Sequence, residues 1–132
     1  MSRFLVFAKP DAVERQLVGK IISRFEKRGF LLESIRSVRP SLSQIEAHYA
    51  EHRDKSFYPG LVRSLEGRVI IPMIWKGNIE TARNSVVGST CPWVASPGTI
   101  RGDFANSIPN NLVHCSDSEE SANREINIWF NN

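Results

Sequence analysis

The sequence predicts an α+β protein in which helices cover a four-stranded antiparallel sheet, an α/β sandwich. Two observations carry this prediction. Short apolar runs typical of strands alternate with segments whose apolar residues recur at helical spacing. The chain has 132 residues, of which 41% are hydrophobic and 23% charged, as in ordinary globular proteins. Residues 1–132 are therefore expected to form a single domain.

Four apolar runs are predicted to be the strands. The first ends at Lys9-Pro10, and the second is closed by Pro40. The third is apolar almost throughout, which favours a central position in the sheet. The fourth is a short run that ends beside His114. The predicted strands cover residues 3–8, 30–38, 69–75 and 112–115.

The segments between the strands are predicted to be helical. Arg28-Gly29 ends the first helix, and Ser41 can cap the next one. Residues 116–120 place capping and acidic side chains at the start of a last helix. That helix is expected to bury Ala122, Ile126 and Trp129 or Phe130. The other predicted helices cover residues 13–25, 41–49, 59–65 and 78–87.

The order of these elements is that of a ferredoxin-like β-α-β-β-α-β fold, with the helices expected on one face of the sheet. Residues 88–109 interrupt the pattern, because they contain three glycines and three prolines and show little periodicity. They are predicted to be a long loop. Long loops in compact domains are usually functional.

The composition limits the expected cellular location and the expected kinds of binding partner. No apolar run approaches the roughly 20 residues that cross a membrane, and the first residues lack the pattern of a signal peptide. We therefore expect a cytoplasmic protein without membrane contact. Cys91 and Cys115 are expected to be free thiols. The net charge of +3 favours anionic partners, either nucleotides or nucleic acid.

His114 stands at the junction between the fourth strand and the last helix. A histidine held there can act as a nucleophile, an acid or base, or a metal ligand. Cys115 follows it directly, but neighbouring residues on a strand point to opposite faces. A catalytic Cys-His pair is therefore not expected.

Separated segments carry side chains that core packing does not require. Lys9, Thr90, Arg101 and Asn111 supply the cations and hydrogen-bonding groups that a phosphate chain and a ribose need. An exposed aromatic ring such as Phe57 can stack on a base. These residues together favour a nucleotide site.

Five motifs, in the same order along the chain, resemble those of the nucleoside diphosphate kinase family. Residues 111–117, Asn-Leu-Val-His-Cys-Ser-Asp, are similar to its active-site signature, and residues 97–104, Pro-Gly-Thr-Ile-Arg-Gly-Asp-Phe, match its loop motif completely. Residues 4–13, 57–62 and 121–126 also fit. Because several independent motifs agree, the resemblance is specific and implies one nucleoside diphosphate kinase domain over residues 1–132.

The resemblance implies a ping-pong reaction. The γ-phosphoryl of a nucleoside triphosphate, typically ATP, would pass to His114 as a phosphohistidine and then to a nucleoside diphosphate. Glu125 would orient the imidazole, and Ser116 and Tyr49 would complete its hydrogen-bond network. Lys9 would bind the transferring phosphate.

The remaining nucleotide contacts are implied in the same way. Arg101 and Thr90 would bind the other phosphates, Asn111 would hold a ribose hydroxyl, and Phe57 would stack on the base without reading its edge. Mg²⁺ would arrive bridging the phosphates rather than in a site made of protein ligands. Asp117 would be at most a water-mediated partner of that ion.

At two positions within the sequence, the chain departs from the family pattern. The family's small residue after the histidine is Cys115 here, and its phosphate-binding arginine falls at Asn84. Arg83 lies one position earlier, in a segment one residue shorter than in many relatives. Either Arg83 substitutes for that arginine, or one phosphate contact is lost.

The resemblance also implies an oligomer, because the family forms hexamers, or tetramers in some bacteria, built from dimers. Pro97 matches a position tied to hexamer contacts, and Trp93 is a large apolar residue available for an interface. A hexamer is the expected assembly.

Two other functions are weighed against the kinase. An RNA-binding module of this fold needs exposed aromatic residues on its central strands, and residues 69–74 offer none. Nucleic acid is therefore not a required partner. A catalytically weakened family member could serve as a nucleotide- or nucleic-acid-binding scaffold. The presence of His114, Lys9 and Arg101 argues against this alternative, whereas Asn84 keeps it open.

Overall fold

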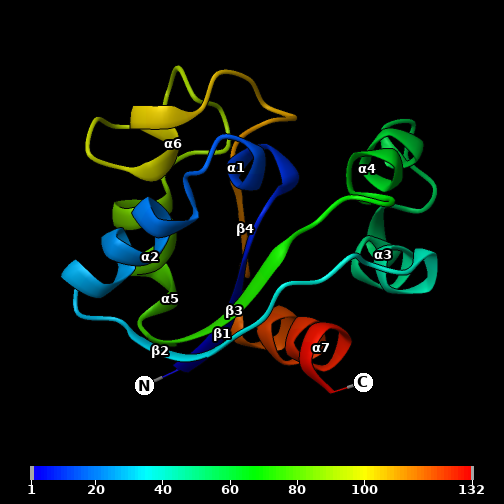
Figure 1. The fold of residues 1–132 in the computed structure, drawn as a ribbon, viewed down its shortest axis with the longest axis horizontal. Helices are drawn as coiled ribbons and strands as arrows, with labels where there is room; N and C mark the ends of the chain where they lie inside the picture. Colours follow the sequence, from blue (N-terminus) through cyan, green and yellow to red (C-terminus); the bar gives the residue numbers. More distant parts are fainter. Residues whose placement is uncertain (1, 132) are drawn as a thin grey trace.

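The structure, a computed structural model, describes residues 2–131 (Figure 1). Four strands form one sheet: β1 (Ser2–Ala8), β2 (Leu31–Ile35), β3 (Ile71–Gly77) and β4 (Val113–Cys115). The helices are α1 (Pro10–Glu14), α2 (Val18–Lys27), α3 (Leu42–His48), α4 (Tyr58–Leu65), α5 (Ile79–Thr81), α6 (Ile100–Phe104) and α7 (Glu119–Phe130). Two further turns are the 3₁₀ helix η1 (Ala50–His52) and the π-helix η2 (Ala82–Val87).

The sheet has the order β2-β3-β1-β4, and every neighbouring pair of strands is antiparallel. This confirms the predicted α+β, ferredoxin-like fold. The long strand β1 lies between β3 and the short edge strand β4, and Phe7 of β1 is paired with His114 of β4. The histidine is therefore fixed by the backbone of the sheet rather than by a loop.

The helices cover both faces of the sheet, so the expectation of one covered face is wrong (Figure 1). Phe4 and Val6 of β1 pack with α2 and η2, whereas Leu5 and Phe7 pack with α3, α4 and α7. All four side chains are fully buried. A strand whose successive residues are all apolar needs cover on both sides. The central strand β1 therefore offers no open face on which RNA bases could stack.

The predicted helix over residues 13–25 is broken in two. Proline starts α1 three residues earlier than expected, because its fixed φ suits the first helical turn. Gln16 then adopts a left-handed φ of 59°, which ends this turn and separates α1 from α2. The redirected chain buries Leu17 against the core.

The other elements lie close to their predicted positions. Ser41 caps α3 through a capping box with Gln44, and Ser118 caps α7 by accepting from the Ser121 N–H. The helix predicted over residues 78–87 is divided into α5 and η2. None of the helices in the described part of the chain combines the length and apolar character needed to cross a membrane.

The segment predicted to be a long loop, residues 88–109, contains the short helix α6. The Thr99 hydroxyl caps this helix by accepting from the Gly102 N–H at 3.0 Å. Gly88 packs directly against Thr99, so a Cβ at position 88 would overlap the Thr99 side chain. This contact fixes the start of the loop over α6.

Two glycines of this loop provide a matched test. Gly88 and Gly98 both have a φ of 92°, but a Cβ at Gly98 would meet nothing within 4 Å. We expect Gly98→Ala to lower the free energy of unfolding by about 1–2 kcal/mol through backbone strain alone. Gly88→Ala should cost about 1–3 kcal/mol more, because of the overlap with Thr99. Urea unfolding of both variants measures the difference, and equal losses would contradict the packing argument.

Candidate active site

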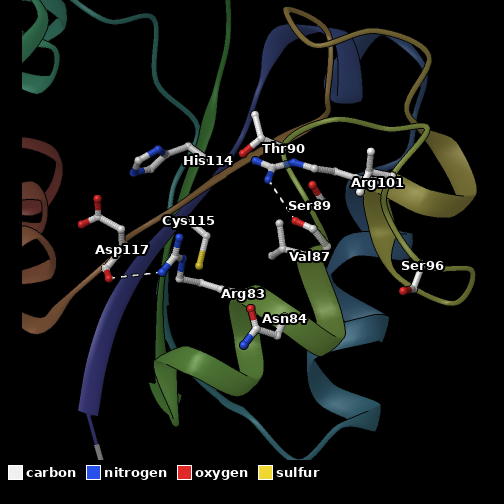
Figure 2. A pocket seen from close by; sticks show the side chains of 12 residues that line it. Arg83, Asn84, Val87, Ser89, Thr90, Ser96, Arg101, His114, Cys115 and Asp117 are labelled. Carbon is white, nitrogen blue, oxygen red and sulfur yellow. Dashed lines mark hydrogen bonds between the residues drawn. The ribbon is translucent and has the colours of Figure 1, made fainter.

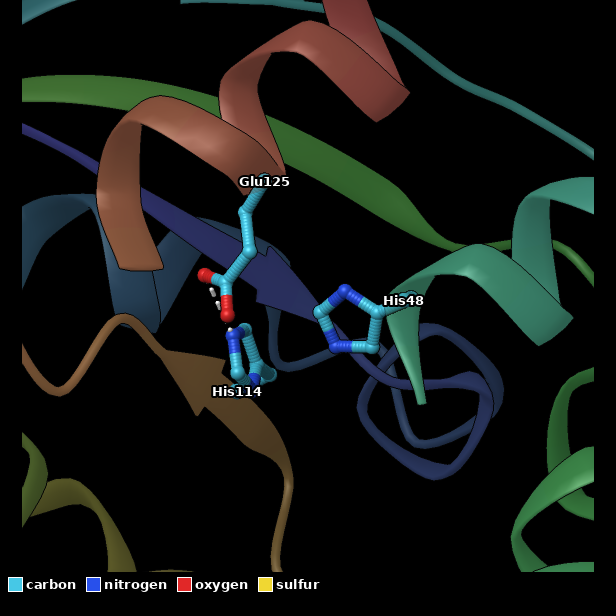
Figure 3. Close-up of side chains that lie close together, drawn as sticks. All are labelled: His48, His114 and Glu125. Atoms are coloured by element: carbon cyan, nitrogen blue, oxygen red, sulfur yellow. Dashed lines mark hydrogen bonds and ion pairs between the residues drawn. The ribbon is translucent and has the colours of Figure 1, made fainter. Parts of the chain in front are cut away.

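His114 is held by groups from two neighbouring elements, α7 and β1. Its Nε2 lies 2.9 Å from Oε1 of Glu125 on α7 (Figure 3). The ring of Phe7 on β1 stacks on the imidazole, with 5.0 Å between the ring centroids. An ionised carboxylate can only accept hydrogen bonds, so Nε2 of His114 carries the proton and the lone pair lies on Nδ1. The arrangement leaves one nucleophilic nitrogen on a fixed ring.

The Glu125 carboxylate is buried, and a second group satisfies it. Ser116 donates from its hydroxyl to the same Oε1 at 2.8 Å, and its Oγ also accepts from the Leu5 N–H at 3.0 Å. The structure therefore brings His114, Glu125 and Ser116 together.

Tyr49 lies close to this network without joining it by a hydrogen bond. Its ring packs edge-on against His48, and burial together with the nearby Glu125 raises the pKa of Tyr49 to about 12. No hydrogen bond joins its hydroxyl to Glu125 within residues 2–131. Instead, Tyr49 lines the neighbouring nucleoside-sized cavity described below.

His114 opens into a polar cavity of about 620 Å³ (Figure 2). Arg101 forms one wall, and its guanidinium donates to the backbone carbonyls of Asn111, Gly88 and Val113. A guanidinium has five N–H groups, so two remain for a ligand. Burial lowers the pKa of Arg101 to about 10, which still leaves it charged near neutral pH.

Arg83 enters the same cavity from η2. The Gly88 N–H donates to the Arg83 carbonyl at 2.9 Å, closing a five-residue π turn. The Arg83 guanidinium lies at the cavity wall beside Asp117 and donates to its carbonyl at 3.4 Å (Figure 2). Asn84 lines the cavity too.

Cys115 also lines the polar cavity, although it follows His114 directly on β4. Burial raises the pKa of the Cys115 thiol to about 12, so it is not a thiolate at neutral pH. No hydrogen bond joins it to His114 in the described residues. This geometry does not favour a cysteine nucleophile.

A second cavity, of about 660 Å³, adjoins the first at Thr90. Lys9 donates to the Asn111 side-chain oxygen at 2.8 Å, and the Asn111 amide donates to the Thr90 carbonyl at 3.1 Å. Burial, with a smaller effect from nearby Arg101, lowers the pKa of Lys9 to about 8. These contacts link residues that are distant in sequence.

Phe57 lies in the wall of this second cavity, at the start of α4. Its ring is 52% exposed, as a stacking surface must be. The exposed side chain of Ile108 lines the same cavity and was missed by the sequence reasoning. A polar cavity with cations thus joins a more apolar one with an open aromatic ring, which suits a phosphate chain attached to a nucleoside.

The sequence reasoning also missed His48. It is 3% exposed, and its ring contacts that of His114 with 4.5 Å between centroids. A signal was present, because Ile45, His48 and Tyr49 share one helical face and a histidine on a buried face requires a partner.

His48, His114 and Glu125 each offer one ligand atom within 4.8 Å of the others, the spacing of a possible metal cluster (Figure 3). However, Nε2 of His114 already binds Glu125, and the Trp129 indole N–H donates to Nδ1 of His48 at 3.2 Å. Mg²⁺ also prefers oxygen ligands. We therefore interpret this group as a hydrogen-bonded pair, His114 and Glu125, with His48 packed against it, rather than as a metal centre.

The comparisons with known proteins agree on one family. The family model for nucleoside diphosphate kinase matches residues 2–132. The nucleoside diphosphate kinase of Thermosynechococcus vestitus is 47% identical, with 98% of this chain and 87% of that protein covered. That of an Exiguobacterium species is 45% identical, with 98% and 94% covered.

Solved structures agree as well. The crystal structure of nucleoside diphosphate kinase from Encephalitozoon cuniculi superposes with a TM-score of 0.95 at 35% identity, covering 100% of this chain and 90% of that one. A nucleoside diphosphate kinase family protein from Babesia bovis gives 0.94 at 40% identity, with 98% and 88% covered. The chain therefore belongs to the nucleoside diphosphate kinase family.

Proposed function

We infer that the chain is a nucleoside diphosphate kinase that transfers the γ-phosphoryl of a nucleoside triphosphate, typically ATP, to a nucleoside diphosphate through a phosphohistidine on His114. Family membership supports the activity. The observation that carries the mechanism is the Glu125–His114 hydrogen bond, which leaves Nδ1 unprotonated on a ring that opens into the polar cavity.

The proposed reaction has two steps of the same kind. The Nδ1 lone pair attacks the γ-phosphorus, the bond from that phosphorus to the bridging oxygen breaks, and the nucleoside diphosphate leaves with the oxygen. A terminal oxygen of a second diphosphate then attacks the phosphohistidine, and the N–P bond breaks. Glu125 and Ser116 keep the ring oriented through both steps, because their hydrogen bonds do not involve Nδ1.

The neighbouring side chains supply binding and charge. We assign Lys9 to the transferring phosphate, and Arg101, Thr90 and Arg83 to the rest of the phosphate chain; their positions around the two cavities support this. Asn111 is assigned to a ribose hydroxyl and Phe57 to the base. Tyr49 lines the same cavity as Lys9 and Thr90, and we assign it to the phosphates that these residues would bind. Phosphoryl transfer depends mainly on such positioning and charge neutralisation.

Mg²⁺ is the proposed cofactor, bound mainly through the nucleotide phosphates. Asp117 is the carboxylate among the residues that line the polar cavity, and a hydrogen bond from Ser121 lowers its pKa, so it is ionised near neutral pH. A single carboxylate fits a cation that keeps its waters and its phosphate ligands. Asp117 would contact that ion at most through its waters, and the ion when bound would neutralise phosphate charge.

The proposal also covers the oligomeric state, the cellular location and the domain organisation. We propose a homohexamer built from dimers, supported by the exposed apolar residues Leu31 and Ile35 on the edge strand β2 and by exposed Trp93 and Val94 in the loop before α6. We also propose a cytoplasmic location and a single domain over residues 1–132. Among the findings, none favours the scaffold alternative or requires nucleic acid.

The phosphohistidine can be tested directly. Wild-type protein and His114→Ala are incubated with γ-³²P-labelled ATP and Mg²⁺, and the labelled protein is treated with acid and with alkali. We expect an acid-labile, alkali-stable label on the wild type that is absent from the variant and moves onto added GDP. Folded wild-type protein that takes up no label would contradict the proposed function.

A second prediction separates Arg83 from Asn84. Loss of a charged hydrogen bond to phosphate costs about 1.5–3 kcal/mol, so Arg83→Ala should raise the KM for nucleoside diphosphates by roughly 10–100-fold. Asn84→Ala, a change at the next position and the same cavity, should alter KM by less than about threefold. Steady-state kinetics of both variants provide the comparison; an unchanged KM in Arg83→Ala would show that this phosphate contact is missing.

A third prediction concerns pH. Lys9 has a pKa of about 8, so it is charged below that pH and loses its charge as the pH rises through it. The value of kcat/KM, which reports on the free enzyme, should therefore fall above about pH 8. In Lys9→Arg, the alkaline fall should move to higher pH, because arginine keeps its proton. A wild-type profile that stays flat into the alkaline range would rule out this role for Lys9.

A further inference from the structure

Behind His114, on the side of α3 and α7, lies a buried aromatic group that the proposed reaction does not use. It consists of Phe7, His48 and Trp129, whose exposed fractions are at most 3%. We call it the aromatic wall. Its three rings contact one another, with centroid separations of 5.2 to 5.8 Å. Both Phe7 and His48 also touch the ring of His114.

One hydrogen bond determines the tautomer of His48. The Trp129 indole N–H can only donate, and it lies 3.2 Å from Nδ1 of His48. Nδ1 must therefore accept, so the proton of neutral His48 is on Nε2. Burial, reinforced by the charges of Arg124 and Lys9 and by His114 and His52, lowers the pKa of His48 well below its usual value. His48 therefore remains a neutral, fixed ring.

The contact between the two histidines is edge to face. Their ring planes are 81° apart, and Figure 3 shows the edge of the His48 ring turned toward His114. Phe7 lies nearly parallel to His114, at an interplanar angle of 26°. Because interiors are closely packed, the two contacts limit different movements of the same ring.

Glu125 alone cannot fix the His114 ring. With a single hydrogen bond at Nε2, the imidazole can still pivot by a small angle about its Cβ–Cγ bond, and such a pivot moves Nδ1, the other ring nitrogen. Phe7 and His48 remove this freedom by packing. Phosphoryl transfer needs the attacking atom in line with the leaving oxygen, so a pivot of this kind would reduce the rate without weakening nucleotide binding.

We propose that His48 is a positioning residue, which holds Nδ1 of His114 in line for phosphoryl transfer through an edge-to-face contact that Trp129 locks. The proposal rests on the proposed function, because it assumes that His114 is the phosphorylated residue. It assigns His48 no contact with the nucleotide. The ring of His48 makes the proposed contact with His114, and the Nε2–H of His48 has no role in it.

Two substitutions distinguish the ring from the hydrogen bond. His48→Asn keeps an oxygen that can accept from the Trp129 indole but removes the ring against His114. His48→Phe restores an aromatic edge but offers no acceptor. Circular dichroism and gel filtration identify conditions in which each variant is folded, and rapid-quench kinetics then measure phosphoenzyme formation at saturating ATP.

We expect the phosphorylation rate of His48→Asn to fall by about tenfold to a hundredfold, with the Kd for ADP changed less than about twofold. His48→Phe should recover part of that rate, because it restores the aromatic edge without the hydrogen bond from Trp129. A wild-type rate in His48→Asn would overturn the proposal, and so would equal losses in the two variants, since the ring would then not be what matters.

A measurement on the wild-type protein keeps the proposal testable if a variant does not fold. Long-range ¹H–¹⁵N NMR of the imidazoles should show His48 as the neutral Nε2–H tautomer. An Nδ1–H tautomer would overturn the proposal. If wild-type protein takes up no phosphoryl label, the proposed function fails, whereas normal labelling with unaffected His48 variants refutes the positioning role alone.

Discussion

The burial of one carboxylate, that of Glu125, is the constraint on which the rest of the site depends. A buried charge is unfavourable unless it is paired and hydrogen-bonded. Glu125 receives bonds from Nε2 of His114 and the hydroxyl of Ser116, and Arg124 lies 3.8 Å from its second oxygen. The hydrogen bonds from His114 and Ser116 each have a second structural effect. The first sets the tautomer of the histidine, and the second ties α7 to the backbone of β1 through Ser116.

This constraint accounts for the cover on one face of the sheet. Glu125 reaches His114 only if α7 packs against β1, and α7 does so by burying Ile126 and Trp129 beside Leu5 and Phe7. The opposite face of β1 is then left to α2 and η2. One face thus orients the histidine, while the other supports the segment that carries Arg83. The polar cavity lies where these two halves of the molecule meet at β4.

The local features of this fold could be read from the sequence, because they depend on neighbouring residues. Ser41 as a cap and the apolar strand ended by Lys9-Pro10 are of this kind. The π turn at Arg83 and the edge contact of His48 are not, since they depend on how distant elements pack. Gln16 shows the same limit: its left-handed φ follows from the need to bury Leu17, and glutamine has no intrinsic preference for it. Candidate residues that stand in local motifs could therefore be named from the sequence, whereas the surroundings that packing gives them, such as the ring of His48 beside His114, could not.

The charges of the site are arranged before any nucleotide binds. Lys9 and Arg101 are both buried enough to lower their pKa values, which means that each is less stable as a cation here than in water. Asn111 partly compensates by accepting from Lys9 and by using its carbonyl to bind Arg101. In the proposed site, a phosphate chain would offer these desolvated cations a stronger partner than the amide does, and it would raise the pKa of Lys9 again. The proposed binding is thus coupled to the charge of the site. The cost of burying the cations is met when the protein folds, and a bound phosphate would then replace Asn111 as the partner of Lys9.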